Sequence, residues 1–289
     1  MTATTAPAPT AGTPAPVHRA AEGARVTFPR VVHAEWLKLW TLRSTYWTLG
    51  VAVLLMAGIA ALGAVSLRSF PEPVEGIPAG SVEMVQMYLQ PGMLLAPLPL
   101  IVLAAMTITG EYATGSVRST FAAVPGRLPV LAAKVVVVAT VTFVTVAVAV
   151  GLSTLLAGAI VPDLAPDWGA PHVARVVLGV VLYATGIALL GLAVGALLRN
   201  TAAAITTVIG LVLIVENVLL MISWKPLEYV RPLLPSTAGS AVTQTPEQLA
   251  DGQFGMAFTP GPWAGYAILL GWVAVLLAVA AVRLRTRDA

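Results

Sequence analysis

The chain alternates long apolar blocks with short polar stretches, and six of these blocks reach or approach the length of a membrane span. In an α-helix that rises 1.5 Å per residue, about 20 apolar residues cross the hydrocarbon core of a bilayer. Pro97 and Pro99 interrupt the second block. We expect a kinked span there, because neighbouring helices can satisfy the carbonyl groups that proline frees. The predicted spans are residues 45–66, 92–109, 135–161, 173–198, 201–222 and 263–282.

The stretches outside the spans predict a simple organisation around a transmembrane domain at residues 45–289. Residues 1–28 are rich in Ala, Thr and Pro, which predicts a disordered cytoplasmic tail. They are not expected to be a signal peptide, because no basic cluster stands directly before a short apolar run. Residues 110–134 form a cytoplasmic loop, and residues 223–262 form an extracellular segment that is too polar to span.

Residues 29–44 predict an amphipathic helix on the inner surface of the membrane. Glu35 and Lys38 are expected on its other faces, away from the membrane. Two interpretations stay open, a plain membrane anchor and a role in gating or assembly. One face gathers apolar side chains, and its two tryptophans suit the membrane interface: Val32, Trp36, Leu39 and Trp40.

The composition agrees with an all-α integral membrane protein. Apolar residues make up 58% of the chain and charged residues 10%, whereas soluble domains are about half apolar and a quarter charged. This excludes a single soluble domain, a disordered chain, a coiled coil and a disulfide scaffold. The chain has no Cys, and its three His residues are scattered. We therefore expect no metal site, thiolate nucleophile or catalytic His pair.

The distribution of charge predicts the orientation of the spans. With a cytoplasmic N-terminus, only four of the 16 Lys and Arg residues lie outside, and most acidic residues lie in the outer loops. We expect a multi-pass protein of a bacterial plasma membrane, and the positive-inside rule predicts that both of its termini are cytoplasmic. Because the basic residues are scattered between apolar blocks, they indicate orientation and not nucleic-acid binding. The four outer residues are Arg68, Arg175, Lys225 and Arg231.

The loop between the second and third spans predicts a compact helix held between them. Gly110 and Gly115 bracket a turn, residues 116–123 can form a short helix, and Pro125 and Gly126 end it. By spacing alone, the loop is equally compatible with a connector rich in turn residues.

Two segments carry a resemblance to a known family: EWLKLWTLRST before the first span, and GEYATGSVRSTFAAVPGRLPVLAAK between the second and third. From about His33 to the C-terminus, the chain resembles membrane subunits of ATP-binding cassette (ABC) exporters of the ABC-2 type. The resemblance implies six spans, a connecting or elbow helix before them, and a loop helix that docks on an ATPase subunit. It implies these candidate coupling positions: Glu111, Gly115, Arg118, Thr120, Pro125 and Arg127.

The chain lacks the G-x-x-x-x-G-K-[ST] motif that binds nucleotide phosphates. We therefore expect no cofactor on this chain and no enzymatic activity of its own. The resemblance implies a separate cytoplasmic ABC ATPase subunit that holds ATP and Mg²⁺, in a complex of two membrane and two ATPase subunits. Whether the second permease subunit makes a homodimer or a heterodimer stays open.

Several residues inside the predicted spans are candidates for helix contacts or a pathway. Glu216 and Asn217 are polar groups in the fifth span, and such groups face protein or a water-filled cavity. They could line a pathway or gate, or hold helices together. Gly191 and Gly195 form a G-x-x-x-G pattern that predicts close helix packing. Lys134 is expected to extend from the inner end of its span to the lipid headgroups.

The leading hypothesis is therefore the transmembrane permease subunit of an ATP-driven exporter. An ion-coupled secondary transporter is an alternative, although only Glu216 is deeply placed and no internal repeat is evident. A membrane enzyme would need convergent catalytic side chains, which the pattern does not offer. A non-transporting sensor or immunity subunit that retains the coupling loop is also compatible. No linear motif identifies the transported molecule.

Overall fold

The computed structural model describes residues 27–70, 76–124, 126–252 and 255–286. These residues form helices and turns without a β-strand, and six segments are long and apolar enough to cross a membrane. The predicted all-α fold with six spans is confirmed. The spans are α2 (Arg43–Ser69), α3 with α4 (Val82–Leu95 and Pro97–Thr114), α6 (Leu128–Ile160), α7 (Val173–Leu198), α8 with the π-helix η3 and α9 (Thr201–Ile209, Gly210–Val215 and Glu216–Met221), and α13 (Pro262–Thr286).

Shorter helices lie at the two ends of the bundle. Helix α1 begins at Phe28, so residues 1–26 of the predicted tail lie outside the described residues. The segment after α9 forms short helices. The shorter elements are α1 (Phe28–Thr41), α5 (Val117–Ala123), η2 (Pro162–Leu164), α10 (Lys225–Val230), η4 (Arg231–Leu233), α11 (Pro235–Ser240), η5 (Ala241–Thr243) and α12 (Pro246–Ala250).

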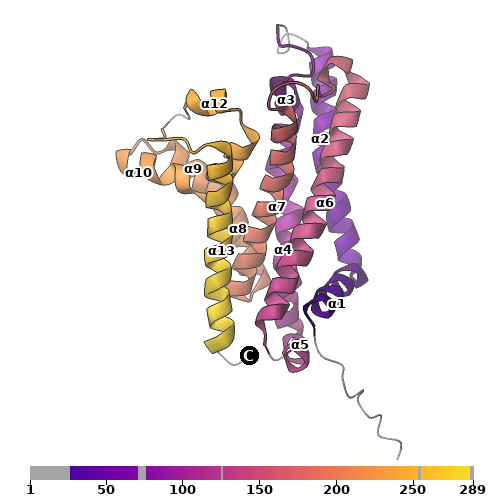
Figure 1. Cartoon of the computed structure of the whole chain (residues 1–289), viewed down its shortest axis with the longest axis vertical. Coiled ribbons are helices and arrows are strands. Elements are labelled where there is room, and N and C mark those ends of the chain that lie inside the picture. The colour runs from indigo at the N-terminus through magenta and orange to yellow at the C-terminus, as the bar shows by residue number, and fades with distance from the viewer. Residues whose placement is uncertain (1–26, 71–75, 125, 253–254, 287–289) are drawn as a thin grey trace, which may run out of the picture.

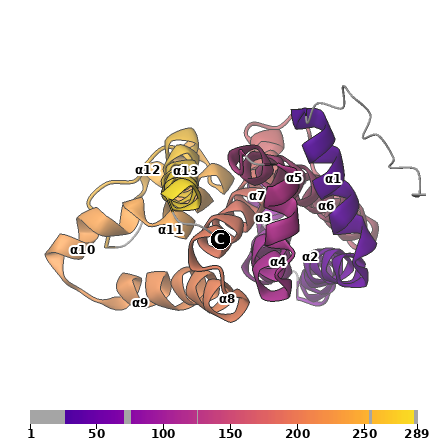
Figure 2. The same ribbon diagram turned by 90° about the horizontal axis from the view of Figure 1, so that it is seen from below.

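Helix α7 is the centre of the bundle. Over an apolar stretch of 18 residues in each span, 83% of the residues of α7 are buried, whereas 22% are buried in the fifth and in the sixth span. Figure 1 shows α1 and α5 at one end and α12 near the other. Seen from below, α7 lies between a group made of α1 to α6 and a group made of α8 to α13 (Figure 2). The fifth and sixth spans therefore present most of their apolar surface outward.

The two glycines of the G-x-x-x-G pattern lie where α7 packs on α4. A Cβ atom on Gly191 would lie 3.1 Å from the carbonyl oxygen of Ile101. One on Gly195 would lie 3.1 Å from a methyl carbon of Ile108 and 3.2 Å from the carbonyl oxygen of Ala105. The absence of side chains at these glycines lets the backbones of the two helices approach closely.

The second and third spans begin earlier than the hydrophobic pattern predicts. Helix α3 begins at Val82 and not near residue 92. Helices α3 and α4 meet at Ala96, directly before Pro97, and Ala96 keeps helical backbone angles (φ −61°, ψ −32°), so the two helices form one span. Helix α6 begins at Leu128, so the connection from α4 to α6 comprises residues 115–127 instead of 110–134. Gln86 in α3 and Lys134 in α6 lowered the apparent hydrophobicity of these stretches, but internal hydrogen bonds satisfy both side chains.

The fifth span is not a continuous α-helix. It contains the π-helix η3 between α8 and α9. In a π-helix the backbone hydrogen bonds join residues i and i+5 instead of i and i+4. The side-chain amide of Asn217 donates to the carbonyl oxygens of Val212, at 3.4 Å, and Leu213, at 3.0 Å. Asn217 thus supports the irregular turn, a local role that the sequence pattern did not indicate.

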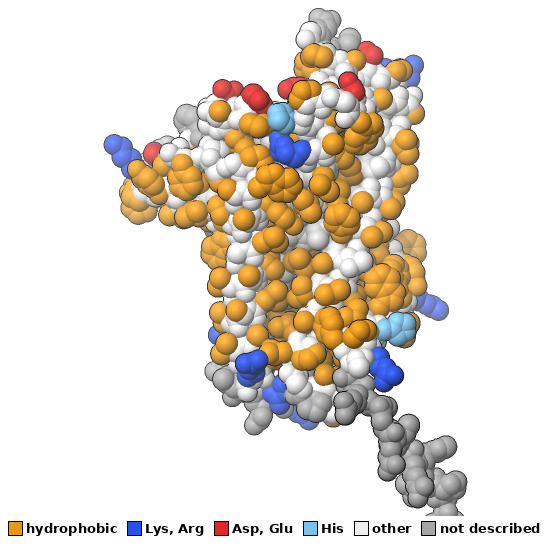
Figure 3. All heavy atoms as spheres, in the orientation of Figure 1, with side chains coloured by type: hydrophobic (Ala, Val, Ile, Leu, Met, Phe, Trp, Pro, Cys, Tyr) orange, Lys and Arg blue, Asp and Glu red, His pale blue; other side chains and the backbone are white. Residues whose placement is uncertain are grey.

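The surface separates into an apolar middle and charged ends. Figure 3 shows hydrophobic side chains over the length of the bundle, acidic side chains gathered at the α12 end, and basic side chains at both ends. Large exposed apolar residues such as Leu54, Leu62 and Leu155 lie on the spans. This pattern suits a bundle whose sides face lipid.

Candidate coupling site

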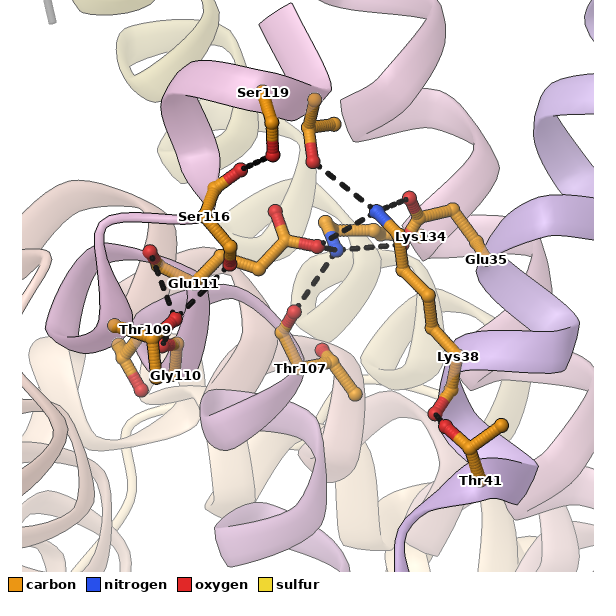
Figure 4. A network of polar contacts seen from close by, with 12 residues as sticks. Glu35, Lys38, Thr41, Thr107, Thr109, Gly110, Glu111, Ser116, Ser119 and Lys134 are labelled. Atoms are coloured by element: carbon orange, nitrogen blue, oxygen red, sulfur yellow. Dashed lines mark hydrogen bonds and ion pairs between the residues drawn. The ribbon is translucent and has the colours of Figure 1, made fainter.

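Four charged side chains meet at the end of the bundle that carries α5. Lys134, on α6, is 4% exposed and donates to Glu35 Oε2 of α1 at 2.6 Å. It also donates to Glu111 Oε1 of α4 and to the carbonyl oxygen of Thr107, both at 2.9 Å. All three donors of this buried ammonium group are therefore used. Figure 4 shows Lys134 between the two glutamates.

Lys38 joins the same two carboxylates from the other side. Its Nζ donates to Glu35 Oε1 at 2.7 Å and to Glu111 Oε1 at 2.9 Å. A third hydrogen bond reaches the hydroxyl of Thr120, on α5, at 3.3 Å. We call Glu35, Lys38, Glu111 and Lys134 the charge quartet. Two positive and two negative groups balance within it, and it connects α1, α4, α5 and α6.

The electrostatics of the quartet keep its exposed member charged. Burial by itself would lower the pKa of Lys38, but the hydrogen bonds and charges of Glu35 and Glu111 outweigh burial and raise this pKa above its usual value. Lys38 therefore stays positively charged at neutral pH, so the quartet keeps its link to α5.

Three predictions about these residues need correction. Glu35 lies on the buried face of α1 and not on a solvated face, because its charge is matched by Lys134. Lys134 does not extend to lipid headgroups but is enclosed between helices. Glu111 was expected to be available to a partner protein, but it is bound by Lys38 and Lys134 within this chain. Sequence reasoning did not bring these groups together, since they lie far apart along the chain.

The short helix α5 presents its charged side chain outward. Arg118 is exposed, and its guanidinium makes no hydrogen bond or ion pair within the described chain. Val117, beside it, is buried at 7% exposure and fixes the inner side of the helix. Helix α5 is thus anchored through Val117 and Thr120 and leaves Arg118 free to meet another molecule.

The two ends of the α5 connection are fixed by backbone geometry. Gly115 ends α4 with φ of 72°, in the left-handed region that favours glycine. Arg127 precedes α6 with φ of 50°, and its Nη1 donates to the carbonyl oxygen of Leu284 on α13 at 2.9 Å. The connection is therefore tied to the last span as well. Pro125, the remaining predicted coupling position, lies outside the described residues.

The tryptophans of α1 cluster at the start of the first span. The ring centroids of Trp36 and Trp40 are 5.8 Å apart, and those of Trp40 and Tyr46 are 5.4 Å apart. Trp36 is 37% exposed. An aromatic cluster of this kind suits the membrane interface, where one side of each ring is apolar and the other wet.

Substituting Gly115 by Ala is expected to destabilise the protein by about 1–2 kcal/mol, because a side chain resists the left-handed conformation. The matched control is Gly110→Ala, since Gly110 lies in the same helix with an ordinary helical φ and open space around it. The thermal unfolding midpoint of the purified protein should fall for Gly115→Ala only. Equal midpoints for the two variants would show that Gly115 does not fix the α5 connection.

A second polar group lies in the fifth span, at Glu216. This side chain is 2% exposed and accepts hydrogen bonds from the backbone N–H groups of Ser236, at 2.9 Å, and Thr237, at 2.7 Å. The hydroxyl of Thr237 donates to it at 2.7 Å. Glu216 thus holds the first turn of α11 against α9, the helix-association role that was one of its two predicted roles.

Two buried polar residues at the α12 end were not singled out from the sequence. Arg231 is 2% exposed and donates to the carbonyl oxygens of Leu219, Ile222 and Gly255, which fixes the end of α9. Gln86 of α3 donates to Gln248 of α12 at 3.0 Å and accepts from it at 2.7 Å. A polar residue is ordinary in an outer loop, and both residues lie in or near segments that were predicted to be outer loops. Their polarity therefore did not mark them as buried.

A known protein family matches nearly the whole chain. The family model described as "ABC-2 family transporter protein" matches residues 30–289, which include all the helices described here from the third residue of α1 onward. No curated protein matches the chain. Among the described residues, no group of three or more His, Asp or Glu side chains is placed to hold a metal ion.

Proposed function

The chain belongs to the ABC-2 family of transporter proteins and is a membrane subunit of an ABC transporter, and we propose that it is an exporter permease that couples through α5 to a separate ATPase subunit. The observation that carries the proposal is the charge quartet. It links α5 to both flanking spans and to α1, so a force applied to α5 reaches three membrane elements.

The proposed energy source is a cytoplasmic ABC ATPase that binds ATP and Mg²⁺. This chain has no phosphate-binding loop motif, and we assign it no catalytic role. The partner would contact Arg118 and the exposed side of α5. A second permease subunit, identical or different, would complete the transport path.

The proposed mechanism follows from the attachment of α5. Closure of the ATPase subunits on ATP would move α5. Thr120 and Lys38 would pass this movement to Glu111 on α4 and Lys134 on α6. Because α4 packs on the central helix α7 at Gly191 and Gly195, tilting α4 would displace the core of the bundle. The transported molecule would then gain access to the outer side.

The proposal places the α5 end and both termini in the cytoplasm of a bacterial cell. Because the chain has no Cys, single cysteines can be introduced without background. Ala79→Cys and Glu247→Cys, at exposed sites near the α12 end, should react with an impermeant maleimide in intact cells. Ala122→Cys, exposed on α5, should react only after the membrane is opened. The reverse labelling pattern would contradict the orientation.

The coupling proposal is tested by reconstituting the chain with its ATPase subunit in proteoliposomes. Hydrolysis should require the ATPase subunit, and transport should require ATP on the side that carries α5. Transport driven by an ion gradient without ATP would contradict the proposal and favour a secondary transporter. Nucleotide-dependent association without transport of any molecule would favour a sensor.

A further inference from the structure

A cavity of about 230 Å³ lies among the second, fourth and fifth spans and α11. Leu98 and Ile101 of α4 supply apolar walls, together with Val212 of η3. Glu216 and Tyr183 bring polar groups into the same lining. The cavity is also lined by Leu94, which is 57% exposed, and by the exposed Asn217. It therefore opens at the side of the helix bundle.

The carboxylate in this cavity is held by neutral groups only. Glu216 accepts two backbone N–H bonds and one hydroxyl bond from α11. Within the described part of the chain, no Lys, Arg or His makes an ion pair with Glu216. Neutral donors satisfy lone pairs, but they leave the negative charge of an ionised carboxylate without a counter-charge. A buried charge is costly unless it is paired.

Most of the other polar groups around the cavity have already used their donors. The hydroxyls of Tyr183 and Ser236 are 2.7 Å apart and share one hydrogen bond, which occupies one of their two O–H donors. Ser240 donates its hydroxyl to the carbonyl oxygen of Thr237, and Asn217 donates its amide to the carbonyl oxygens of η3. What stays available is one hydroxyl hydrogen of the Tyr183–Ser236 pair and, in larger number, acceptor lone pairs on Glu216 and on the Oδ1 atom of Asn217. The lining therefore suits a ligand that donates hydrogen bonds.

We propose that this cavity binds an amphipathic cation, a protonated amine with a small apolar body, as the transported molecule or a close analogue of it. The ammonium group would pair with Glu216, and the apolar part would lie against Leu98, Ile101 and Val212. A ligand of this kind supplies the counter-charge that Glu216 lacks and donors for its remaining lone pairs. The assignment of the ligand as the transported molecule rests on the proposed exporter function.

The cavity is lined by α4, the helix that the proposed coupling mechanism would tilt. Its walls come from α4, which carries Glu111 of the charge quartet at its other end, and from the π-helix η3. π-Helical turns occur frequently at functional sites. A tilt of α4 would change the distance between Leu98 and Val212, and thereby the space offered to the ligand.

The test uses a hexylammonium probe with a terminal diazirine and the neutral alcohol of the same shape. Each is photoactivated with the wild-type protein in phosphatidylcholine nanodiscs, and the labelled residues are identified by mass spectrometry. The ammonium probe should label residues 93–101 and 212–220 at least about tenfold more than the alcohol does, because an ion pair is lost with the alcohol. Equal labelling by the two probes would overturn the proposal.

Two variants test the charge of Glu216 and the volume of the cavity separately. Glu216→Gln should reduce ammonium labelling of the cavity by about tenfold and leave alcohol labelling unchanged. Leu98→Trp keeps Glu216 but fills the cavity, and should abolish labelling by both probes. Its control is Leu62→Trp on α2, at a side chain that is 71% exposed and remote from this lining. Unchanged ammonium labelling in Glu216→Gln or in Leu98→Trp would overturn the assignment.

Further arms identify the source of the amine and keep the two proposals separate. If added phosphatidylethanolamine competes with the probe, the bound ammonium belongs to a lipid headgroup; if only soluble amines compete, it belongs to a soluble molecule. Either result supports the ammonium site.

Co-purification of the ATPase subunit is measured for each variant. Intact ATPase binding with equal ammonium and alcohol labelling would refute the cavity proposal alone, whereas ammonium-selective labelling without any ATPase partner would refute the exporter proposal alone.

Discussion

Lys134→Met is expected to destabilise the protein by about 3–5 kcal/mol and to uncouple ATP hydrolysis from transport. The substitution leaves Glu35 and Glu111 buried or half-buried with only Lys38 to balance them. Three hydrogen bonds that join α6 to α1 and α4 are lost with the ammonium group. The thermal unfolding midpoint and ATP-driven transport of the reconstituted complex measure the two effects.

The double variant Lys134→Met/Glu35→Gln separates loss of charge balance from loss of packing. It removes one charge of each sign and leaves Lys38 paired with Glu111. Stability should recover in part, because no excess charge stays buried. Lys225→Met, at an exposed position on α10, is the matched control and should have little effect. A double variant as unstable as Lys134→Met alone would show that charge balance is not the cause.

The second large effect is expected for Arg118→Glu, which should reduce binding of the ATPase subunit by about tenfold or more. Arg118 is exposed on α5 and is not used in the internal network, so the fold and the unfolding midpoint should not change. Reversing the charge on a docking surface places like charges together and weakens association. The ATPase subunit recovered with the purified permease, titrated over subunit concentration, measures this change.

The control for Arg118→Glu is Arg283→Glu. Arg283 is also exposed and lies in the last turn of α13, at the same end of the bundle, but outside α5. If both variants lost ATPase binding equally, the loss would reflect the overall positive charge of this end and not docking at α5. Loss confined to Arg118→Glu supports the assignment.

The spans could be predicted because membrane insertion depends on the hydrophobicity of local segments. Residues 173–198, the predicted fourth span, coincide with α7 as observed. The prediction was less accurate where polar residues enter a span. Gln86 and Lys134 lie near the observed starts of their spans, in stretches that the hydropathy pattern leaves outside the predicted spans. Both side chains have partners from distant parts of the chain. Such partners are set by packing, which a local pattern does not contain.

The sequence predicted a candidate site in the α5 connection, but it did not predict the hydrogen bonds and ion pairs within that site. The turn residues around α5 and the resemblance to exporters pointed to residues 111–127. The charge quartet joins Glu35 to Lys134, which are 99 positions apart in the chain. A pair at that separation has no periodic signal. The cap that Glu216 provides to α11 has the same cause, since the fifth span and α11 meet only after the chain folds back.

The central claim is that α5 is the surface on which the ATPase subunit docks. A photo-crosslinking amino acid placed at position 122, on the exposed side of α5, tests it in intact cells, with the same residue at position 247 on α12 as the control. The account predicts that position 122 forms an adduct with a protein that carries an ATPase phosphate-binding loop, and that position 247 does not. An ATPase adduct from position 247, or none from position 122 while the assembled complex is active, would contradict the account.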